Sequence, residues 1–166
     1  MTTGGGLYRY QLRDRVTVTD YLEGTPCIRF DGKEDNVSDL CGEKLSEGWV
    51  SAILSRLLPE HAPGTSFALL APETEHDIPR YVLYIAAAQE PARCLDALLE
   101  RQLCANPNYS YCVRMGQLRP VAVVRVDQSA ARRYLEVAYK AGMRLGNIKP
   151  AALSSASGWR DILCSG

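Results

Sequence analysis

Hydrophobic and polar residues alternate with a period of two near the start of the chain, over residues 7–30. Successive side chains of a β-strand point to opposite faces, so this alternation predicts strands. The segment Glu23-Gly24-Thr25-Pro26 has the composition of a turn and separates two of the alternating runs. The pattern therefore predicts a strand near residues 7–12 and a β-hairpin with strands over 15–22 and 26–32.

The spacing of apolar residues becomes helical after a polar connection at residues 33–39. Ser46 is a favourable N-cap and Glu47 suits the positive end of a helix. Pro59 is expected to end the helix, which gives a predicted range of 46–58. The apolar residues at helical spacing are Val50, Ile53, Leu54, Leu57 and Leu58.

The rest of the chain alternates between strand and helix patterns. Residues 66–71 and 80–87 predict two antiparallel strands joined by an exposed loop over 72–79, and a helix is expected from Pro91 to about residue 105. A short helix or turn at 106–116, a strand at 120–126 and a helix capped by Ser129 follow. The predicted fold class is α+β: an N-terminal β-hairpin followed by a small mixed sheet covered by helices on one or both faces. The residues after 150 are expected to be loose or to dock only through Trp159, Ile162 and Leu163.

Charge and composition exclude several classes of protein. The 166 residues carry 19 basic and 19 acidic side chains, so the chain lacks the field that attracts nucleic acids or anionic membranes. Its apolar runs are far shorter than the roughly 20 residues that span a bilayer, and the N-terminus has no secretory signal. We therefore expect a cytoplasmic protein with no membrane or nucleic-acid partner. Its six cysteines form no C-x-x-C pair, so we expect ordinary thiols and no metal site.

Three features of the sequence allow more than one interpretation. The cluster Glu73-Thr74-Glu75-His76-Asp77 could bind a metal or act in acid–base chemistry, but a solvated loop tip between two strands is favoured. At the N-terminus, residues 4–6 are a glycine run that suits either a phosphate loop or a flexible chain end. Asp14 could accept hydrogen bonds from a ribose or form a surface ion pair with Arg13 or Arg15.

Residues 6–14, which read Gly-Leu-Tyr-Arg-Tyr-Gln-Leu-Arg-Asp, resemble the nucleotide-binding signature of the GH3 family of acyl-acid amido synthetases. The resemblance implies that Asp14 holds the ribose of ATP or of the adenylate, and that Tyr8 and Tyr10 line the nucleotide side of the cleft. Arg13 occupies the place where the family usually has glycine.

Two further segments resemble adenylate-forming enzymes, in the same order along the chain. Residues 30–35 are similar to the hinge motif, with Lys33 at the nucleotide-binding arginine position and Asp35 as the hinge acid. Residues 145–150 are similar to the C-terminal lysine loop, in which Lys149 would be the catalytic cation that stabilises charge on the α-phosphate. The resemblance implies a hairpin and hinge over 1–36, a C-terminal α+β domain over 37–150 and a tail over 151–166.

The reaction implied by the resemblance is ATP-dependent activation of a carboxylic acid, with Mg²⁺, followed by amide formation with an amino acid or another amine. An N-terminal adenylation domain would be the partner that carries the acyl pocket, so we expect this chain to be a C-terminal portion that is inactive alone. The alternative is a non-catalytic α+β binding module derived from that domain, which Arg13 and Lys33 favour. A third possibility is a nucleic-acid binder whose basic aromatic face would consist of Arg9, Arg13, Arg15 and Arg29 with Tyr8 and Tyr10. The neutral net charge makes this class unfavourable.

Overall fold

The computed structural model describes residues 14–33, 36–75, 77–140 and 150–164. The chain divides into two compact units, Met1–Asp35 and Asn36–Gly166, which we describe separately. In the first unit, strands β1 (Asp14–Leu22) and β2 (Thr25–Lys33) pair antiparallel. Glu23 and Gly24 both have positive φ, 50° and 82°, as a two-residue hairpin turn requires. The predicted hairpin is confirmed, whereas the strand predicted at 7–12 lies outside the described residues.

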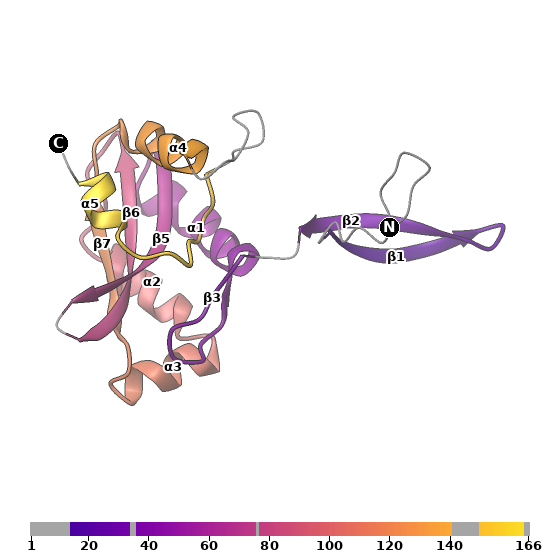
Figure 1. Cartoon of the computed structure of the whole chain (residues 1–166), viewed down its shortest axis with the longest axis horizontal. Helices are drawn as coiled ribbons and strands as arrows, with labels where there is room; N and C mark the ends of the chain where they lie inside the picture. The colour runs from indigo at the N-terminus through magenta and orange to yellow at the C-terminus, as the bar shows by residue number, and fades with distance from the viewer. Residues whose placement is uncertain (1–13, 34–35, 76, 141–149, 165–166) are drawn as a thin grey trace. The chain divides into compact units, whose positions relative to one another are not determined.

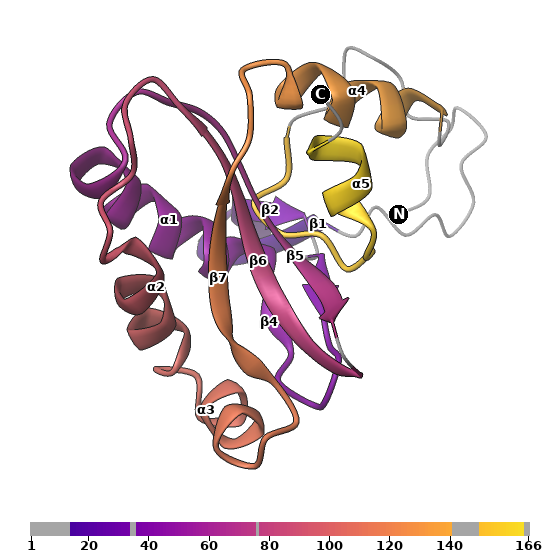
Figure 2. The ribbon, with the colours of Figure 1, turned by 90° about the vertical axis from the view of Figure 1, so that its left-hand side faces the viewer.

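The second unit is built on a three-stranded mixed sheet in the order β5-β6-β7. Strand β5 (Thr65–Glu75) is antiparallel to β6 (Ile78–Ala87), and β6 is parallel to β7 (Arg119–Arg125). Helices α2 (Leu95–Leu103) and α3 (Pro107–Arg114) connect the two parallel strands, as parallel pairing demands (Figure 2). The mixed sheet predicted from the sequence is confirmed.

Helices cover both faces of this sheet. Helix α1 (Glu47–His61) lies with α2 and α3 on one face, and α4 (Ala130–Lys140) lies with α5 (Trp159–Leu163) on the other (Figures 1 and 2). Strand β6 is therefore buried on both sides: Tyr81 and Leu83 point into one core cluster, and Val82 and Tyr84 into the other. The apolar run of this strand reflects its position between two layers of helices.

Two helices differ from their predicted ends. Helix α1 continues past Pro59 to His61. A proline so close to the end of a helix disrupts few hydrogen bonds, and the Ala62 amide still donates to the Leu58 carbonyl at 2.9 Å. Helix α2 begins at Leu95, so the prediction of a start at Pro91 was wrong. The cap predicted at Ser46 is confirmed, since its hydroxyl accepts the Trp49 amide at 3.4 Å.

The segment predicted as an exposed loop at 72–79 belongs largely to the β5–β6 hairpin. Pairing continues to Glu75 on one strand and begins at Ile78 on the other. Glu73 is 9% exposed and accepts hydrogen bonds from the Tyr84 hydroxyl (2.8 Å) and from the Arg160 amide (3.1 Å). The prediction of a solvated loop tip was wrong for Glu73, because helix α5 folds back over this part of the sheet.

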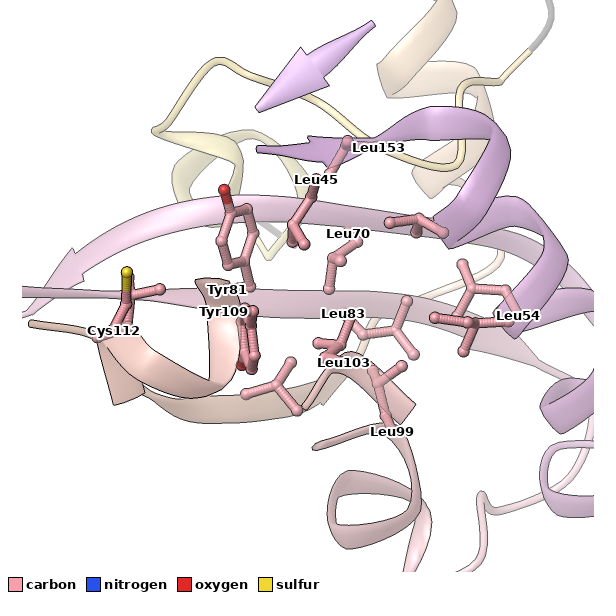
Figure 3. Close-up of a cluster of buried hydrophobic side chains, with 14 residues drawn as sticks. Leu45, Leu54, Leu70, Tyr81, Leu83, Leu99, Leu103, Tyr109, Cys112 and Leu153 are labelled. Carbon is pink, nitrogen blue, oxygen red and sulfur yellow. The ribbon is translucent and has the colours of Figure 1, made fainter. Parts of the chain in front are cut away.

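A buried carboxylate fixes the loop between β3 (Val37–Ser38) and β4 (Leu45–Ser46). Glu43 is fully buried and accepts hydrogen bonds from the Leu40 and Cys41 amides, both at 2.8 Å. The Tyr81 hydroxyl donates to the same carboxylate at 2.5 Å and lies 2.8 Å from the Ser38 hydroxyl, which can donate to it. Burial, and then the bond to Glu43, raises the pKa of Tyr81 well above its ordinary value, so the phenol stays protonated and remains a donor. Tyr81 thereby joins this loop to the core cluster drawn in Figure 3.

The C-terminal segment is docked on the sheet. Trp159 and Leu163 are buried, and the Trp159 indole stacks on Tyr134 with ring centroids 5.2 Å apart. The indole N–H donates to the Ser154 hydroxyl at 2.9 Å, which satisfies the polar end of a buried aromatic side chain.

Asp127 forms hydrogen bonds to the start of α4, and its protonation at acid pH should lower the stability of the fold. It accepts the Ser129 amide at 2.7 Å and Arg133 Nη2 at 2.6 Å. Hydrogen bonds from Ser129 and then from Arg133 lower the pKa of Asp127 from its ordinary 3.8 to about 2. A carboxyl group whose pKa is lowered by folding stabilises the fold at pH values above its ordinary pKa. This contribution is lost as the pH falls through the lowered pKa of about 2.

We therefore expect Asp127→Asn to be less stable than the wild type by a constant amount above about pH 4 and by a shrinking amount below it. Urea unfolding midpoints measured at intervals from neutral pH down to about pH 2 would test this. A difference that stays constant over the whole range would show that the charge of Asp127 has no such role.

Candidate functional site

The hairpin places two of the predicted nucleotide-binding residues opposite each other. Asp14 opens β1, Lys33 closes β2, and the two are partners in the antiparallel register. Residues that are far apart in sequence are thus adjacent across one ladder. The predicted residues Tyr8, Tyr10 and Asp35 lie outside the described residues.

The predicted catalytic Lys149 also lies outside the described residues, but the structure describes the segment that begins directly after it. This segment, residues 150–154, runs beside β5 and forms a parallel bridge between Leu153 and Leu70. The Leu70 amide donates to the Ala152 carbonyl at 2.9 Å, and the Ser154 amide donates to the Leu70 carbonyl at 2.8 Å. Leu153 is fully buried in the same core cluster as Leu70 (Figure 3). The chain after Lys149 is therefore fixed to the edge of the sheet.

Two polar side chains form further hydrogen bonds to the same segment. Asn36 donates from Nδ2 to the Leu153 carbonyl at 2.9 Å, and Glu47 accepts the Ala152 amide on Oε1 at 3.2 Å. The two residues are themselves joined, because the Glu47 amide donates to the Asn36 carbonyl at 2.9 Å. We call this pair the Asn36–Glu47 clamp. A further bond runs from the Ala151 amide to the Tyr134 hydroxyl at 3.2 Å.

Sequence reasoning missed the clamp. Asn36 follows the predicted hinge acid in a polar connection, and Glu47 has the features of a residue that favours the first turn of a helix. Neither residue gives a local signal that it will bond a segment more than a hundred positions away. The one available hint is the position of Asn36 next to the hinge motif.

An open cavity of about 450 Å³ lies between α1 and the start of β5, beside residues 150–152. Its size falls within the range of small-molecule sites, about 300–1,000 Å³. The described lining is largely apolar with three hydroxyl groups, from Ser51, Ser55 and Thr65, and it carries no charged side chain. This lining offers shape and weak hydrogen bonds but no group that would anchor a phosphate.

Within the described residues, no three histidine, cysteine or carboxylate side chains are grouped closely enough to hold a metal ion. No helix in the described part of the chain has the length and apolar character to cross a bilayer.

The fold resembles that of known enzymes. A solved GH3.15 acyl acid amido synthetase superimposes with a TM-score of 0.77 at 20% sequence identity, over 99% of this chain and 32% of that one. A structure titled AtGH3.15 acyl acid amido synthetase in complex with 2,4-DB gives a TM-score of 0.73 at 19% identity, over 99% and 31%. The chain therefore has a fold found in part of acyl acid amido synthetases.

Family comparison gives the more specific assignment. Residues 50–157 match the GH3 family C-terminal domain, and residues 1–33 match the GH3 family central domain. The chain belongs to the GH3 family, and most of it is the family's C-terminal domain.

A curated relative supports the same assignment over a short stretch. The probable indole-3-acetic acid-amido synthetase GH3.7 of Oryza sativa subsp. japonica is 40% identical over 47 residues, which are 28% of this chain and 8% of that protein. The chain spans about a third of the solved synthetases that it resembles.

Proposed function

We propose that this chain is the C-terminal portion of an ATP-dependent acyl-acid amido synthetase and is inactive without an N-terminal adenylation domain. In the proposed first step a carboxylate oxygen attacks the α-phosphorus of ATP, and the bond to the β-phosphate breaks to release pyrophosphate. In the second step an amine attacks the acyl carbon of the adenylate, AMP leaves, and the amine loses a proton. The cytoplasm, which supplies ATP and keeps thiols reduced, is the proposed compartment.

The observation that carries this proposal is the order of the family matches around the predicted hinge. The central-domain match ends at residue 33 and the C-terminal-domain match begins at residue 50, and Asp35 lies between them. A residue between two rigid bodies can absorb the backbone rotation that brings one small domain to two successive reactions. In this proposal Lys33 contacts the nucleotide together with Tyr8, Tyr10 and Asp14.

Lys149 is the proposed catalytic cation. The α-phosphate gains charge as the carboxylate attacks, and a fixed ammonium group stabilises that charge more in the transition state than in bound ATP. Mg²⁺ would enter with ATP and neutralise the leaving pyrophosphate.

The exposed apolar side chains of the hairpin support the proposal that an N-terminal domain packs against it. A two-stranded hairpin is marginally stable alone, and this one exposes several large apolar side chains. Val18 and Ile28 are directly paired and are 48% and 60% exposed, and Leu22 near the turn is 70% exposed. We propose that the rest of the central domain, in the N-terminal part of the synthetase, covers these residues.

The test is ATP–pyrophosphate exchange, which reports reversible adenylate formation without requiring the amine. We expect no exchange from this chain alone with any member of a panel of carboxylic acids. Exchange should appear when a GH3 N-terminal region is present in the same polypeptide or added in trans. Persistent absence of exchange from a folded complete protein, over a broad panel, would favour the non-catalytic binding module.

A further inference from the structure

The two edges of the three-stranded sheet differ in how the described residues cover them. The outer edge of β5 is paired at Leu70 with residues 152–154 of the same chain. Strand β7 is the last strand in the order β5-β6-β7 and forms the opposite edge (Figure 2). An unpaired edge presents backbone donors and acceptors to which a further strand can be added.

The hydrogen bonds of β7 identify which of its backbone groups face this edge. The Val126 amide donates to the Ile85 carbonyl of β6 at 2.9 Å. The direction of the backbone groups alternates along a strand, so the groups of Val124 and Ala122 also face β6, in agreement with the parallel register. The residues at odd positions of β7 therefore direct their backbone groups outward.

Only the first part of this outer edge is covered by the described residues. The Val121 amide donates to Oε2 of Glu100, from helix α2, at 2.8 Å, which also confirms the outward direction. Two and four positions later, no described residue bonds the backbone of Val123 or of Arg125 on this edge. Val123 is partly exposed, so its free donor and acceptor are accessible. The edge can accept a short strand at these two residues.

An open cavity of about 380 Å³ lies at this free part of the edge. Val123 and Arg125 line it from β7, and Pro91, Ala92 and Leu95 line it from the start of α2 and the connection before it. Leu95 is buried in a core cluster against which Val123 also packs, so this side of the cavity is apolar. The cavity offers a place for one apolar side chain of an added strand.

Charges of both signs surround the same cavity. Its lining includes Glu90, Arg93, Asp96 and Arg125. Arg125 forms an ion pair with Glu90, and the two side chains are 48% and 76% exposed. An ion pair with this exposure contributes little to stability. Arg125 can therefore exchange Glu90 for a carboxylate of a partner at small cost.

We propose that this edge of β7 is a docking site for an extended peptide segment of a partner protein. The segment adds as an antiparallel strand, the commoner arrangement, and contains in order an acidic residue, any residue and an apolar residue. In this register the acidic residue lies opposite Arg125 and the apolar residue lies opposite Val123. Paired side chains share one face of a sheet, so the apolar side chain enters the cavity beside Leu95. A second copy of β7 would not supply the acidic residue, since Arg119–Arg125 contains none.

The first experiment tests backbone pairing with a capped peptide, Thr-Glu-Thr-Val-Thr, titrated into the isotope-labelled chain. The amide NMR signals of Val123 and Arg125 should shift at millimolar peptide, and the signal of Ala122, which faces β6, should shift less. Methylation of the valine nitrogen removes the donor to the Val123 carbonyl and should weaken binding about 10-fold. The reversed peptide, Thr-Val-Thr-Glu-Thr, has the same composition and should bind about threefold more weakly than the original.

The second experiment tests the charge that selects the peptide. Arg125→Glu should weaken binding of the glutamate peptide about 3- to 10-fold, and Thr-Lys-Thr-Val-Thr should bind this variant better than the glutamate peptide does. Glu90→Gln removes the competing carboxylate and should strengthen binding of the glutamate peptide about two- to threefold. Arg132→Glu makes the same change of charge at an exposed site on α4, on the other face of the sheet, and should have no effect.

The outcomes separate this inference from its alternatives. If neither the Val123 nor the Arg125 signal shifts at millimolar peptide, this edge takes no strand and the inference is wrong. Equal binding of the methylated peptide would exclude backbone pairing, and tighter binding of the reversed peptide would exclude the antiparallel register. If the chain alone sediments as a dimer that Arg125→Glu dissociates, a second copy occupies the edge in place of a partner peptide. None of these outcomes bears on the proposed synthetase function, which assigns no role to β7.

Discussion

Replacing Lys149 with alanine in the complete synthetase is expected to lower the kcat of ATP–pyrophosphate exchange by about 100- to 1,000-fold, the loss typical of removing one group that stabilises transition-state charge. The α-phosphate carries extra charge in the transition state, and the ammonium group would interact with it most strongly there. Removing the ammonium group should therefore slow the reaction more than it weakens the binding of ATP. The KM for ATP should therefore change little. A Lys149→Arg variant keeps the charge but changes its geometry and should recover part of the loss.

Asp14→Ala is the companion variant with a different expected signature. A carboxylate that holds the ribose contributes to the binding of ATP and of the transition state alike, so we expect the KM for ATP to rise more than kcat falls. If Lys149→Ala raised the KM for ATP and left kcat unchanged, Lys149 would be a binding residue and the proposed role would be wrong.

The second large effect concerns Gly64, between α1 and β5, in the chain as it stands. Its φ is +71°, and a Cβ added there would lie 2.8 Å from the Cβ of Ala88. Gly64→Ala should therefore combine the cost of a left-handed backbone, about 1–2 kcal/mol, with an overpacking cost of about 1–3 kcal/mol. The Ala88 methyl is attached to backbone that donates to the Gly64 carbonyl at 3.1 Å, so it cannot move aside freely. We expect a total loss of unfolding free energy of about 2–5 kcal/mol, measurable by urea denaturation.

Gly116 supplies the matched control for this prediction. Its φ is +69°, nearly the same, but an added Cβ would meet nothing within 4 Å. Gly116→Ala should therefore show the backbone cost alone, about 1–2 kcal/mol. Adding Ala88→Gly to Gly64→Ala should remove the clash and recover part of the loss. Equal losses at Gly64 and Gly116 would show that the chain relieves the contact by a small shift.

Local patterns were sufficient where the structure depends on local physics. The turn at Glu23-Gly24 fixes the hairpin because two positive φ values in succession strongly constrain the chain. The cap at Ser46 and the helical spacing after it predicted the start of α1 to within one residue. The end of α1 was wrong because it depends on packing as well as on propensity, and Pro59 is tolerated there.

The candidate site could be predicted only as far as its motifs extend. The segments around Asp14, Lys33 and Lys149 carry the resemblance to the family, and the roles of these residues remain proposals. The clamp could not be predicted, because Asn36 and Leu153 are 117 positions apart and bond through one side-chain amide and one backbone carbonyl. Such a bond leaves no period and no spacing in the sequence.

The sequence by itself determined the α+β class, the hairpin, most of the helices and strands, and the membership of the family, since these follow from periodicity, turn chemistry and short motifs. Tertiary structure alone decided that Glu43 and Glu73 are buried acceptors, and that residues 152–154 are hydrogen-bonded both to β5 and to the Asn36–Glu47 clamp. The physical reason is that a charged residue can be buried only where donors converge on it. In this chain the Tyr81 hydroxyl that donates to Glu43, and both donors to Glu73, come from segments that meet only after folding.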